Sequence, residues 1–257
     1  MLEVKGLMKS YASIPAIQGV TFSLQPGEVL GCIGPNGSGK STTVKMLTGL
    51  LEPTRGEIIF RGANIRNNLV NYRKNLGYAP EEANLYPYLT GWEYLEMVGI
   101  LRGMDDARMR KKLEDLLQLF SLHAHRNSVM AAYSKGMRQR ILLIASMMDN
   151  PDILILDEPL SGLDVTSVLI FKNLVKYLAQ HGRALFYCSH VLEIVERVCS
   201  HLLILRQGQV IACGPMAEME RQNRLGVGSL ENTFSNLVED VDTEKIARNI
   251  VDVISAA

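Results

Sequence analysis

Residues 34–42 have the types and spacing of a loop that binds phosphate groups. They are Gly34, Pro35, Asn36, Gly37, Ser38, Gly39, Lys40, Ser41 and Thr42. This spacing lets consecutive backbone N–H groups surround the phosphates of a nucleotide at the positive end of the helix that follows. Glycine is needed because a Cβ would block close backbone approach or the positive φ angles that turn the N–H groups inward. Lys40 is expected to reach the β- and γ-phosphates, and the Ser41 hydroxyl is expected to bind Mg²⁺.

Two acidic residues follow a second apolar stretch. Residues 153–156 are all Ile or Leu and predict a fully buried central strand, and Asp157 and Glu158 come directly after it. In an α/β sheet this strand end would lie at the same edge as the phosphate-binding loop. One acid of a nucleotide-hydrolysing site holds Mg²⁺ and a second polarises the attacking water, so we assign Asp157 to the metal and Glu158 to the general base. The alternative is a solvated strand end with incidental acids.

Strand and helix patterns place these residues in an α/β protein. After residue 148, strands alternate with helices, which implies parallel strands joined by helical crossovers. Residues 90–148 carry apolar side chains at helical spacing and predict a mainly helical insert. The expected strands are 2–6, 17–24, 28–33, 56–61, 153–157, 184–188 and 202–206, and the expected helices are 41–50, 165–180 and 190–199. The chain closes with a Gly-rich turn at 226–228 and an amphipathic run that carries Ile246, Ile250, Val253 and Ile254.

Composition narrows the class of protein. The 257 residues are enough for a large core, and 27 basic residues balance 27 acidic ones, so no overall field favours nucleic acid or an anionic membrane. The four cysteines are separated and predict reduced core residues of a cytosolic protein. No stretch approaches the roughly 20 apolar residues of a membrane span, and residues 1–5 predict a strand rather than a signal peptide.

Residues 133–140, between the loop and the acid pair, resemble the signature segment of the ATP-binding cassette (ABC) ATPases. Of the five signature positions only Ser134 and Gly136 match, but the Gln-Arg pair at 139–140 follows in the family's manner. Other elements occur in the family's order: Tyr11 where an aromatic ring stacks on adenine, residues 161–164 as the D-loop, and His190 as the switch histidine. The resemblance spans about residues 2–214 and implies an α/β P-loop NTPase with a mainly parallel central sheet, an antiparallel β subdomain near the N-terminus and an inserted helical subdomain.

The resemblance also implies roles for these residues. Ser134 and the Gly136 N–H, at the start of a helix, would bind the γ-phosphate of ATP held by a second subunit, so that two chains enclose two ATP molecules. His190 would hydrogen-bond the γ-phosphate and hold the water near Glu158. Asp164 would contact the facing subunit, or it could be the N-cap of the helix at 165–180. The alternative for Tyr11 and His190 is an ordinary structural role, but the spacing of His190 from Asp157 and Glu158 favours the switch histidine.

Two positions depart from the family pattern. Glu81 stands where the family has the Q-loop glutamine; its carboxylate can still ligate Mg²⁺ or orient water, but it adds negative charge beside the phosphates. Residues 135–137 (Lys-Gly-Met) replace the usual Gly-Gly-Gln, which puts a cation near the opposing γ-phosphate. We interpret both as features of a subgroup, because Lys40, Asp157, Glu158 and His190 are present.

The resemblance favours a function and a set of partners. It predicts a Mg²⁺-dependent ATPase subunit that powers a membrane transporter. Short motifs in the sequence resemble those of ABC ATPases that serve bacterial exporters, which favours export. The expected partners are a membrane-spanning permease and a second ABC ATPase chain, as homo- or heterodimer, without nucleic acid, at the cytoplasmic face of the membrane. The expected domains are 1–214 for the ATPase and 215–257 for a C-terminal helical extension.

Three other classes of function are alternatives to a transporter subunit. An ABC ATPase that drives a mechanical or regulatory membrane complex is not separated from a transporter by sequence. A ribosome-associated ABC protein usually has two cassettes in one chain, and a phosphate-loop kinase would not explain the signature or Glu158. Four aromatic residues between Tyr86 and Tyr94 suit a groove for a permease helix, or they pack the helical insert.

Overall fold

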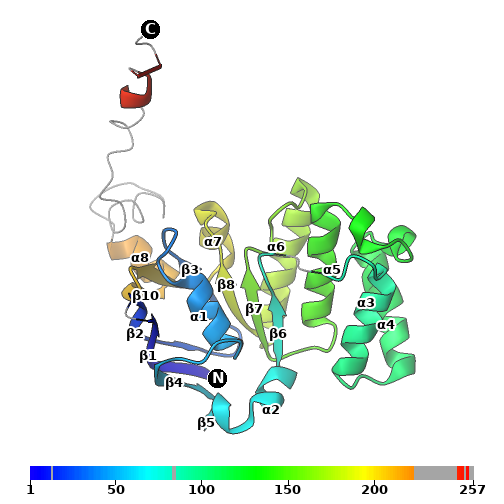
Figure 1. Cartoon of the computed structure of the whole chain (residues 1–257), viewed down its shortest axis with the longest axis horizontal. Coiled ribbons are helices and arrows are strands. Elements are labelled where there is room, and N and C mark those ends of the chain that lie inside the picture. The colour runs from blue at the N-terminus through cyan, green and yellow to red at the C-terminus, as the bar shows by residue number, and fades with distance from the viewer. Residues whose placement is uncertain (13, 83–84, 223–247, 252, 255–257) are drawn as a thin grey trace.

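The computed structural model describes residues 1–12, 14–82, 85–222, 248–251 and 253–254. Two sheets lie at the centre and at one end of the molecule, and a group of helices forms the other end (Figure 1). None of the helices within the described ranges is long and apolar enough to cross a membrane. The expected α/β fold with an N-terminal antiparallel sheet and a helical insert is confirmed.

The larger sheet has six strands and carries the predicted site at one edge. Its order is β10-β9-β3-β8-β7-β6, and every neighbouring pair is parallel except β10 with β9. The inner strands β3, β7 and β8 are buried at every position, as their apolar sequences predict. The bounds are Val29–Ile33 (β3), Leu76–Ala79 (β6), Ile153–Asp157 (β7), Ala184–Cys188 (β8), His201–Arg206 (β9) and Gln209–Pro215 (β10).

The smaller sheet is antiparallel and has the order β2-β1-β4-β5. Its strands are β1 (Leu2–Tyr11), β2 (Ile14–Leu24), β4 (Arg55–Phe60) and β5 (Ala63–Asn64), so β1 and β2 extend beyond the predicted ranges. Helix α1 (Lys40–Leu47) shares one buried apolar cluster with both sheets, which includes Leu7, Val44 and Phe186. This packing fixes the direction of α1, whose first residues belong to the phosphate-binding loop.

Helices α6 (Val165–Gln180) and α7 (Leu192–Val198) cover the opposite face of the large sheet. Phe171 and Val175 of α6 and Val195 of α7 pack with β-strand residues such as Leu154 and Leu185. Helix α6 has the predicted bounds. The shorter segments are η1 (Ile65–Asn68), α2 (Leu69–Lys74), η2 (His123–His125), η3 (Met130–Ala132) and α8 (Met216–Gln222).

The helical insert consists of α3 (Gly91–Leu101), α4 (Asp106–Leu119) and α5 (Lys135–Met147). It has an apolar core of its own, made by residues such as Leu95, Met109, Leu113, Leu117 and Ile144. Helix α3 begins with a capping box, in which the Thr90 hydroxyl accepts from the Glu93 N–H and the Glu93 carboxylate accepts from the Thr90 N–H. The predicted helical insert is therefore present, and Leu143 of α5 links it to the apolar cluster of the large sheet.

Two close contacts help to join the insert to the large sheet. Gly77 of β6 lies so close to α5 that a Cβ there would collide with the Ser146 carbonyl oxygen. At the end of α3, Nη1 of Arg102 donates to the carbonyl oxygens of Arg73 at 2.9 Å and Leu76 at 3.0 Å, and to Oδ2 of Asp149 at 3.1 Å. One guanidinium thus connects α3, the end of α2, the start of β6 and the turn after α5.

Several features differ from the sequence-based expectation or lie beyond it. Strands β6 and β10 were not predicted. The four cysteines are free thiols, as expected, but Cys213 is exposed rather than buried, because β10 is the edge strand of the large sheet. The predicted boundary at residue 214 stays a prediction; β10 ends at Pro215 and α8 follows directly.

The predicted end of the chain is only partly described. The Gly-rich turn at 226–228 and Ile246 lie outside the described residues. Residues 248–251 and 253–254 are helical, and Ile250, Val253 and Ile254 are exposed there.

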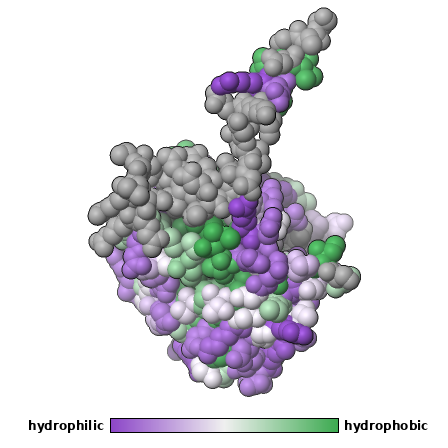
Figure 2. Space-filling view, turned by 90° about the vertical axis from the view of Figure 1, so that its left-hand side faces the viewer, coloured by the Kyte–Doolittle hydropathy of each residue, from purple (hydrophilic) through white to green (hydrophobic). Residues whose placement is uncertain are grey.

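Figure 2 shows the end of the molecule that carries the small sheet and β10. Hydrophobic residues gather in the middle of this face and hydrophilic residues cover its lower part. The exposed apolar side chains on these strands include Ile14 of β2 and Ile211 of β10. This face therefore carries both apolar and polar side chains.

Candidate nucleotide-binding site

The phosphate-binding loop connects β3 to α1, as the sequence predicts. Gly37 and Gly39 have φ angles of 78° and 106°, in the left-handed region that favours glycine. A Cβ on Gly34 would collide with the Leu205 carbonyl oxygen and the Ser38 side chain, and one on Gly39 would meet the Ile17 side chain. Each glycine is therefore required by backbone angle, by close packing or by both.

Lys40 is held at this loop by backbone carbonyls. Its Nζ donates to the carbonyl oxygen of Gly34 at 2.6 Å and to that of Pro35 at 3.1 Å. A lysine ammonium has three donors, so one N–H remains for an anion at the start of α1. Within the described residues, the Oγ of buried Ser38 has no hydrogen-bond partner. Free donors at the N-terminus of a helix are suited to phosphate oxygens.

The loop opens into a cavity of about 370 Å³. Apart from Ala16, all the residues that line it were predicted as site residues: Asn36, Gly37, Gly39, Lys40, Ser41, Thr42, Glu81, Asp157, Glu158 and His190. They come from the β3–α1 loop and from the segments that follow β6, β7 and β8. The parallel strands bring them together because their carboxyl ends share one edge of the sheet.

Glu158 is fixed by donors at the end of β8. Its Oε1 accepts from the His190 N–H at 2.8 Å and lies 2.8 Å from Nδ1 of the same histidine. Its Oε2 accepts from the Ser189 hydroxyl at 3.1 Å. Ser189 was not predicted as a site residue; its signal in the sequence is a small hydroxyl residue at the end of a buried strand, directly before His190.

Burial, together with the nearby carboxylates of Glu81 and Glu158, raises the pKa of Asp157 to about 6, and Lys40 and Lys45 oppose the shift. A buried carboxyl group with like charges beside it is stabilised when a cation binds. Its neighbours Ser41 and Glu81 also offer oxygen ligands, which Mg²⁺ prefers.

The described residues contain no group of three or more His, Cys, Asp or Glu side chains that could hold a metal ion by themselves. Mg²⁺ is usually bound by one or two carboxylates together with waters and the phosphates of a substrate. The donor set of Ser41, Asp157 and Glu81 fits that arrangement.

The predicted residues of the signature and D-loop lie outside this cavity. Ser134 is exposed and caps α5, where its Oγ accepts from the Met137 N–H at 3.2 Å. A Cβ on Gly136 would lie 2.5 Å from the Gly162 carbonyl oxygen, so the start of α5 packs tightly against the D-loop. Asp164 is the N-cap of α6 and accepts from the Ser167 N–H at 2.9 Å. Asp164 therefore has the N-cap role that was the alternative to a contact with a facing subunit.

Tyr11 also lies outside the cavity. It is half exposed at the end of β1, and Nζ of Lys9 lies 5.6 Å from the centre of its ring. A role in stacking on adenine stays a prediction.

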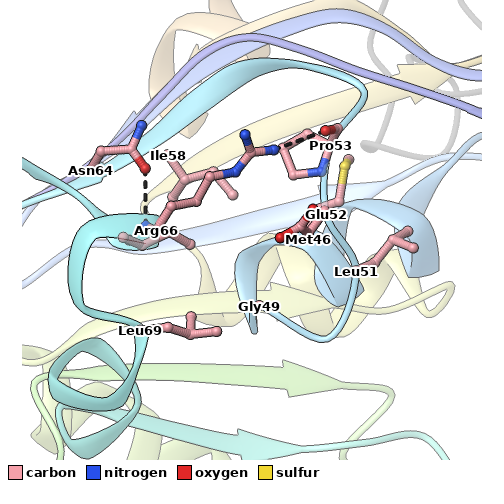
Figure 3. Close-up of a pocket in the computed structure, with 10 residues that line it drawn as sticks. Met46, Gly49, Leu51, Glu52, Pro53, Ile58, Asn64, Arg66 and Leu69 are labelled. Carbon is pink, nitrogen blue, oxygen red and sulfur yellow. Dashed lines mark hydrogen bonds between the residues drawn. The ribbon is translucent and has the colours of Figure 1, made fainter.

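A smaller cavity of about 120 Å³ lies between the end of α1, β4 and η1 (Figure 3). Arg66 crosses it and donates to the Pro53 carbonyl oxygen at 2.9 Å, and Asn64 accepts from the Arg66 N–H at 3.0 Å. This cavity contains none of the predicted site residues. The chemistry of the chain is therefore concentrated at the edge of the large sheet.

Comparison with known proteins shows which family shares this fold and site. Residues 17–161 match the ABC transporter family. The ATP-binding protein EcsA of Bacillus subtilis is 31% identical over 93% of this chain and 97% of its own length. The linearmycin resistance ATP-binding protein LnrL of the same organism is 34% identical over 85% of this chain and 70% of its own.

Solved structures of ATP-binding cassettes are similar to this chain. One described as the ATP-binding subunit of an ABC transporter has a TM-score of 0.87, with 34% identity over 92% of this chain and 99% of the other. A dimeric ATP-binding cassette in a post-hydrolysis state, bound to ADP and Pi, has a TM-score of 0.77, with 25% identity over 84% of this chain and 99% of the other.

The chain is a P-loop ATPase of the α/β cassette type. It belongs to the ABC transporter family, as the ATP-binding subunit that energises the transporter and hydrolyses ATP to ADP and phosphate.

Proposed function

We propose that the cavity at the edge of the large sheet hydrolyses Mg²⁺-bound ATP, with Glu158 as the general base. The observation that supports this role most directly is the position of Glu158 at the end of β7, in the same cavity as Lys40. Ser41, Asp157 and Glu81 would hold Mg²⁺, which would neutralise phosphate charge when bound.

Different residues would bind the phosphates, accept the proton and orient the attacking water. The loop N–H groups and Lys40 bind and orient the phosphates. Glu158 accepts a proton from the attacking water as the water oxygen bonds to the γ-phosphorus and the bond to the ADP oxygen breaks. His190, whose Nδ1 is already 2.8 Å from Glu158, orients that water and the γ-phosphate.

Glu158→Gln tests this role. The amide cannot accept the proton, so turnover is expected to fall by about 10²- to 10⁴-fold while ATP still binds. Phosphate release and equilibrium nucleotide binding measure the two effects separately. Turnover within a few-fold of wild type would remove Glu158 from the role of general base.

The position of Ser134 and Gly136 supports a site shared between two chains. Both lie outside the cavity that contains Lys40 and Glu158, yet Ser134 is the exposed N-cap of α5, a helix of 13 residues. Helix N-termini attract anions. We infer that each chain supplies its α5 terminus to ATP bound by the other, in a dimer of identical or related chains.

A groove near the end of α3 suits a helix of the permease. It has a volume of about 440 Å³ and includes exposed Leu50, Val70 and Leu101 with basic residues beside them. An amphipathic helix with an apolar face and acidic flanks would complement it. The full lining is Thr48, Leu50, Val70, Arg73, Lys74, Leu76, Tyr78, Leu101 and Arg102.

The segment from Tyr86 to Tyr94, predicted for this purpose, does not line the groove. Trp92 and Tyr94 pack against the apolar core of the insert, whereas Tyr86 and Tyr88 are exposed. The packing alternative therefore applies to the first pair, and a contact of the exposed pair with the permease stays a prediction.

Leu101→Asp tests the groove. The acidic side chain would repel an apolar helix, so less of the chain is expected in the membrane fraction of the producing cells, with ATPase activity of the isolated chain retained. Leu119→Asp on α4 is the matched control, because the two leucines are similarly exposed, at 79% and 73%, and Leu119 does not line the groove. Equal membrane fractions for both variants would contradict docking at this groove.

We propose that the transporter is an exporter and that the chain is held at the inner face of the membrane by its permease. The support is the similarity to LnrL, a linearmycin resistance ATP-binding protein, and the resemblance of short sequence motifs to those of bacterial exporters. Cells that lack the chain are expected to become more sensitive to a toxic compound that the transporter exports, with linearmycin as the first compound to test, and wild type but not Glu158→Gln should restore resistance. Unchanged sensitivity together with a defect in envelope integrity would favour the mechanical or regulatory alternative.

A further inference from the structure

Ser189 makes two hydrogen bonds that constrain it completely. Its Oγ accepts from the Val191 N–H at 3.1 Å and donates to Oε2 of Glu158 at 3.1 Å. A serine hydroxyl has one proton, and a carboxylate only accepts, so the direction of both bonds is settled. Ser189 is only 3% exposed, so its hydroxyl is shielded from water and depends on these two partners.

Glu158 depends on such support because its backbone is strained. Its φ angle is 46°, in the left-handed region that residues other than glycine rarely adopt. Its N–H donates to the Cys188 carbonyl oxygen at 3.0 Å, which ties the end of β7 to the end of β8. A conformation of this kind persists only where the surroundings hold it.

The two oxygens of Glu158 are held in different ways. Oε1 is next to His190, whose side chain is 74% exposed and lines the cavity, so the imidazole is free to move toward a nucleotide. Oε2 is held by the buried Ser189 hydroxyl. When His190 turns to the γ-phosphate, the Ser189 hydroxyl remains as the side-chain donor that keeps the carboxylate in place.

We propose that Ser189 is a positioning residue that holds Oε2 of Glu158 and so directs Oε1 to the attacking water. This inference rests on the proposed role of Glu158 as general base. It assigns to Ser189 an effect on the chemical step and none on nucleotide affinity, because Ser189 does not line the cavity.

The test compares Ser189→Ala with wild type. We expect kcat to fall about tenfold with KM for ATP within twofold, the loss of one hydrogen bond to a charged group. Ser189→Thr keeps the hydroxyl and is expected to retain most of kcat. Ser200→Ala is the control, because the Ser200 hydroxyl also accepts one hydrogen bond and donates another, in its case with the Val29 N–H and carbonyl oxygen, and Ser200 does not line the cavity. The kcat of this control should match wild type.

A second comparison uses Glu158→Gln as background. If Ser189 acts through Glu158, adding Ser189→Ala to Glu158→Gln should leave the slow single-turnover rate unchanged. A tenfold further loss there, or a kcat of folded Ser189→Ala within twofold of wild type, would overturn the inference. If Glu158→Gln itself turns over normally, the general-base assignment fails instead, so the two failures are distinguishable.

Discussion

Asp157 shows how the site stores unfavourable electrostatic energy until a cation arrives. Burial, Glu81 and Glu158 raise its pKa to about 6 from the ordinary 3.8. The folded chain therefore binds more protons than the unfolded chain between these two pH values, and stability falls as the pH rises through that window. The cost is fully present above the folded pKa.

Asp157→Asn should remove this cost. In EDTA at pH 8 the variant is expected to be more stable than wild type by about 3 kcal/mol, since the pKa rises by about two units and each unit corresponds to about 1.4 kcal/mol. Well below the ordinary pKa of 3.8 the difference should vanish, because Asp157 is then neutral in both the folded and the unfolded chain. Urea denaturation at the two pH values measures the difference, and a variant less stable than wild type at pH 8 would refute the argument.

Individual site residues differed in how far the sequence could predict them. Lys40 and its loop neighbours form one continuous stretch, so local spacing was sufficient. Glu158 and His190 each follow a buried strand, and sheet topology then brings them together. Ser189 escaped prediction because its importance comes from one contact with a residue 31 positions away. The proposed docking groove was not predicted because three separate segments of the chain form it.

Among the elements, the strands buried on both faces were the most predictable. Residues 153–157 and 184–188 were predicted with the observed bounds because their sequences are continuously apolar. Strand β6 has only four residues and includes Gly77, so no pattern could develop. Strand β10 is half exposed and ends in Gly-Pro, which is typical of a turn. Short and edge strands depend on their neighbours more than on their own sequence.

Helix α5 offers a test at the level of an element. In Gly136→Ala the new Cβ would lie 2.5 Å from the Gly162 carbonyl oxygen, so the start of α5 or the D-loop must move. ATP binding by a single chain should persist, because neither segment lines the cavity, while hydrolysis should fall at least tenfold. Met137→Ala, one residue further and half-buried, is the control. Loss of ATP affinity in Gly136→Ala would show that the substitution disturbs the cavity of the same chain, and it would contradict the prediction.

At the scale of the whole molecule, the separation of the α5 terminus from the cavity predicts complementation. Neither a Ser134→Arg chain nor a Lys40→Ala chain has an intact site when it pairs with itself. Mixed dimers would contain one intact site, in which the Ser134→Arg chain supplies the loop and the Lys40→Ala chain supplies the α5 terminus.

The mixture should therefore recover ATPase activity. If pairing is random and the sites fire independently, an equal mixture should reach about a quarter of wild-type activity. Light scattering of Glu158→Gln with ATP and Mg²⁺ gives a separate measurement, since trapped ATP should hold the dimer together. A particle that binds ATP yet stays monomeric at tens of micromolar would contradict self-association of the isolated chain.

Arg102 connects the groove to the nucleotide site in a way that has a thermodynamic consequence. Its guanidinium lines the groove and also bonds to the start of β6, the strand that leads to Glu81. If ATP changes the arrangement of these segments, the affinity of the groove for a permease helix must change with it. Reciprocity then requires the permease to alter the affinity for ATP by the same factor, so the membrane partner is itself an effector of nucleotide binding.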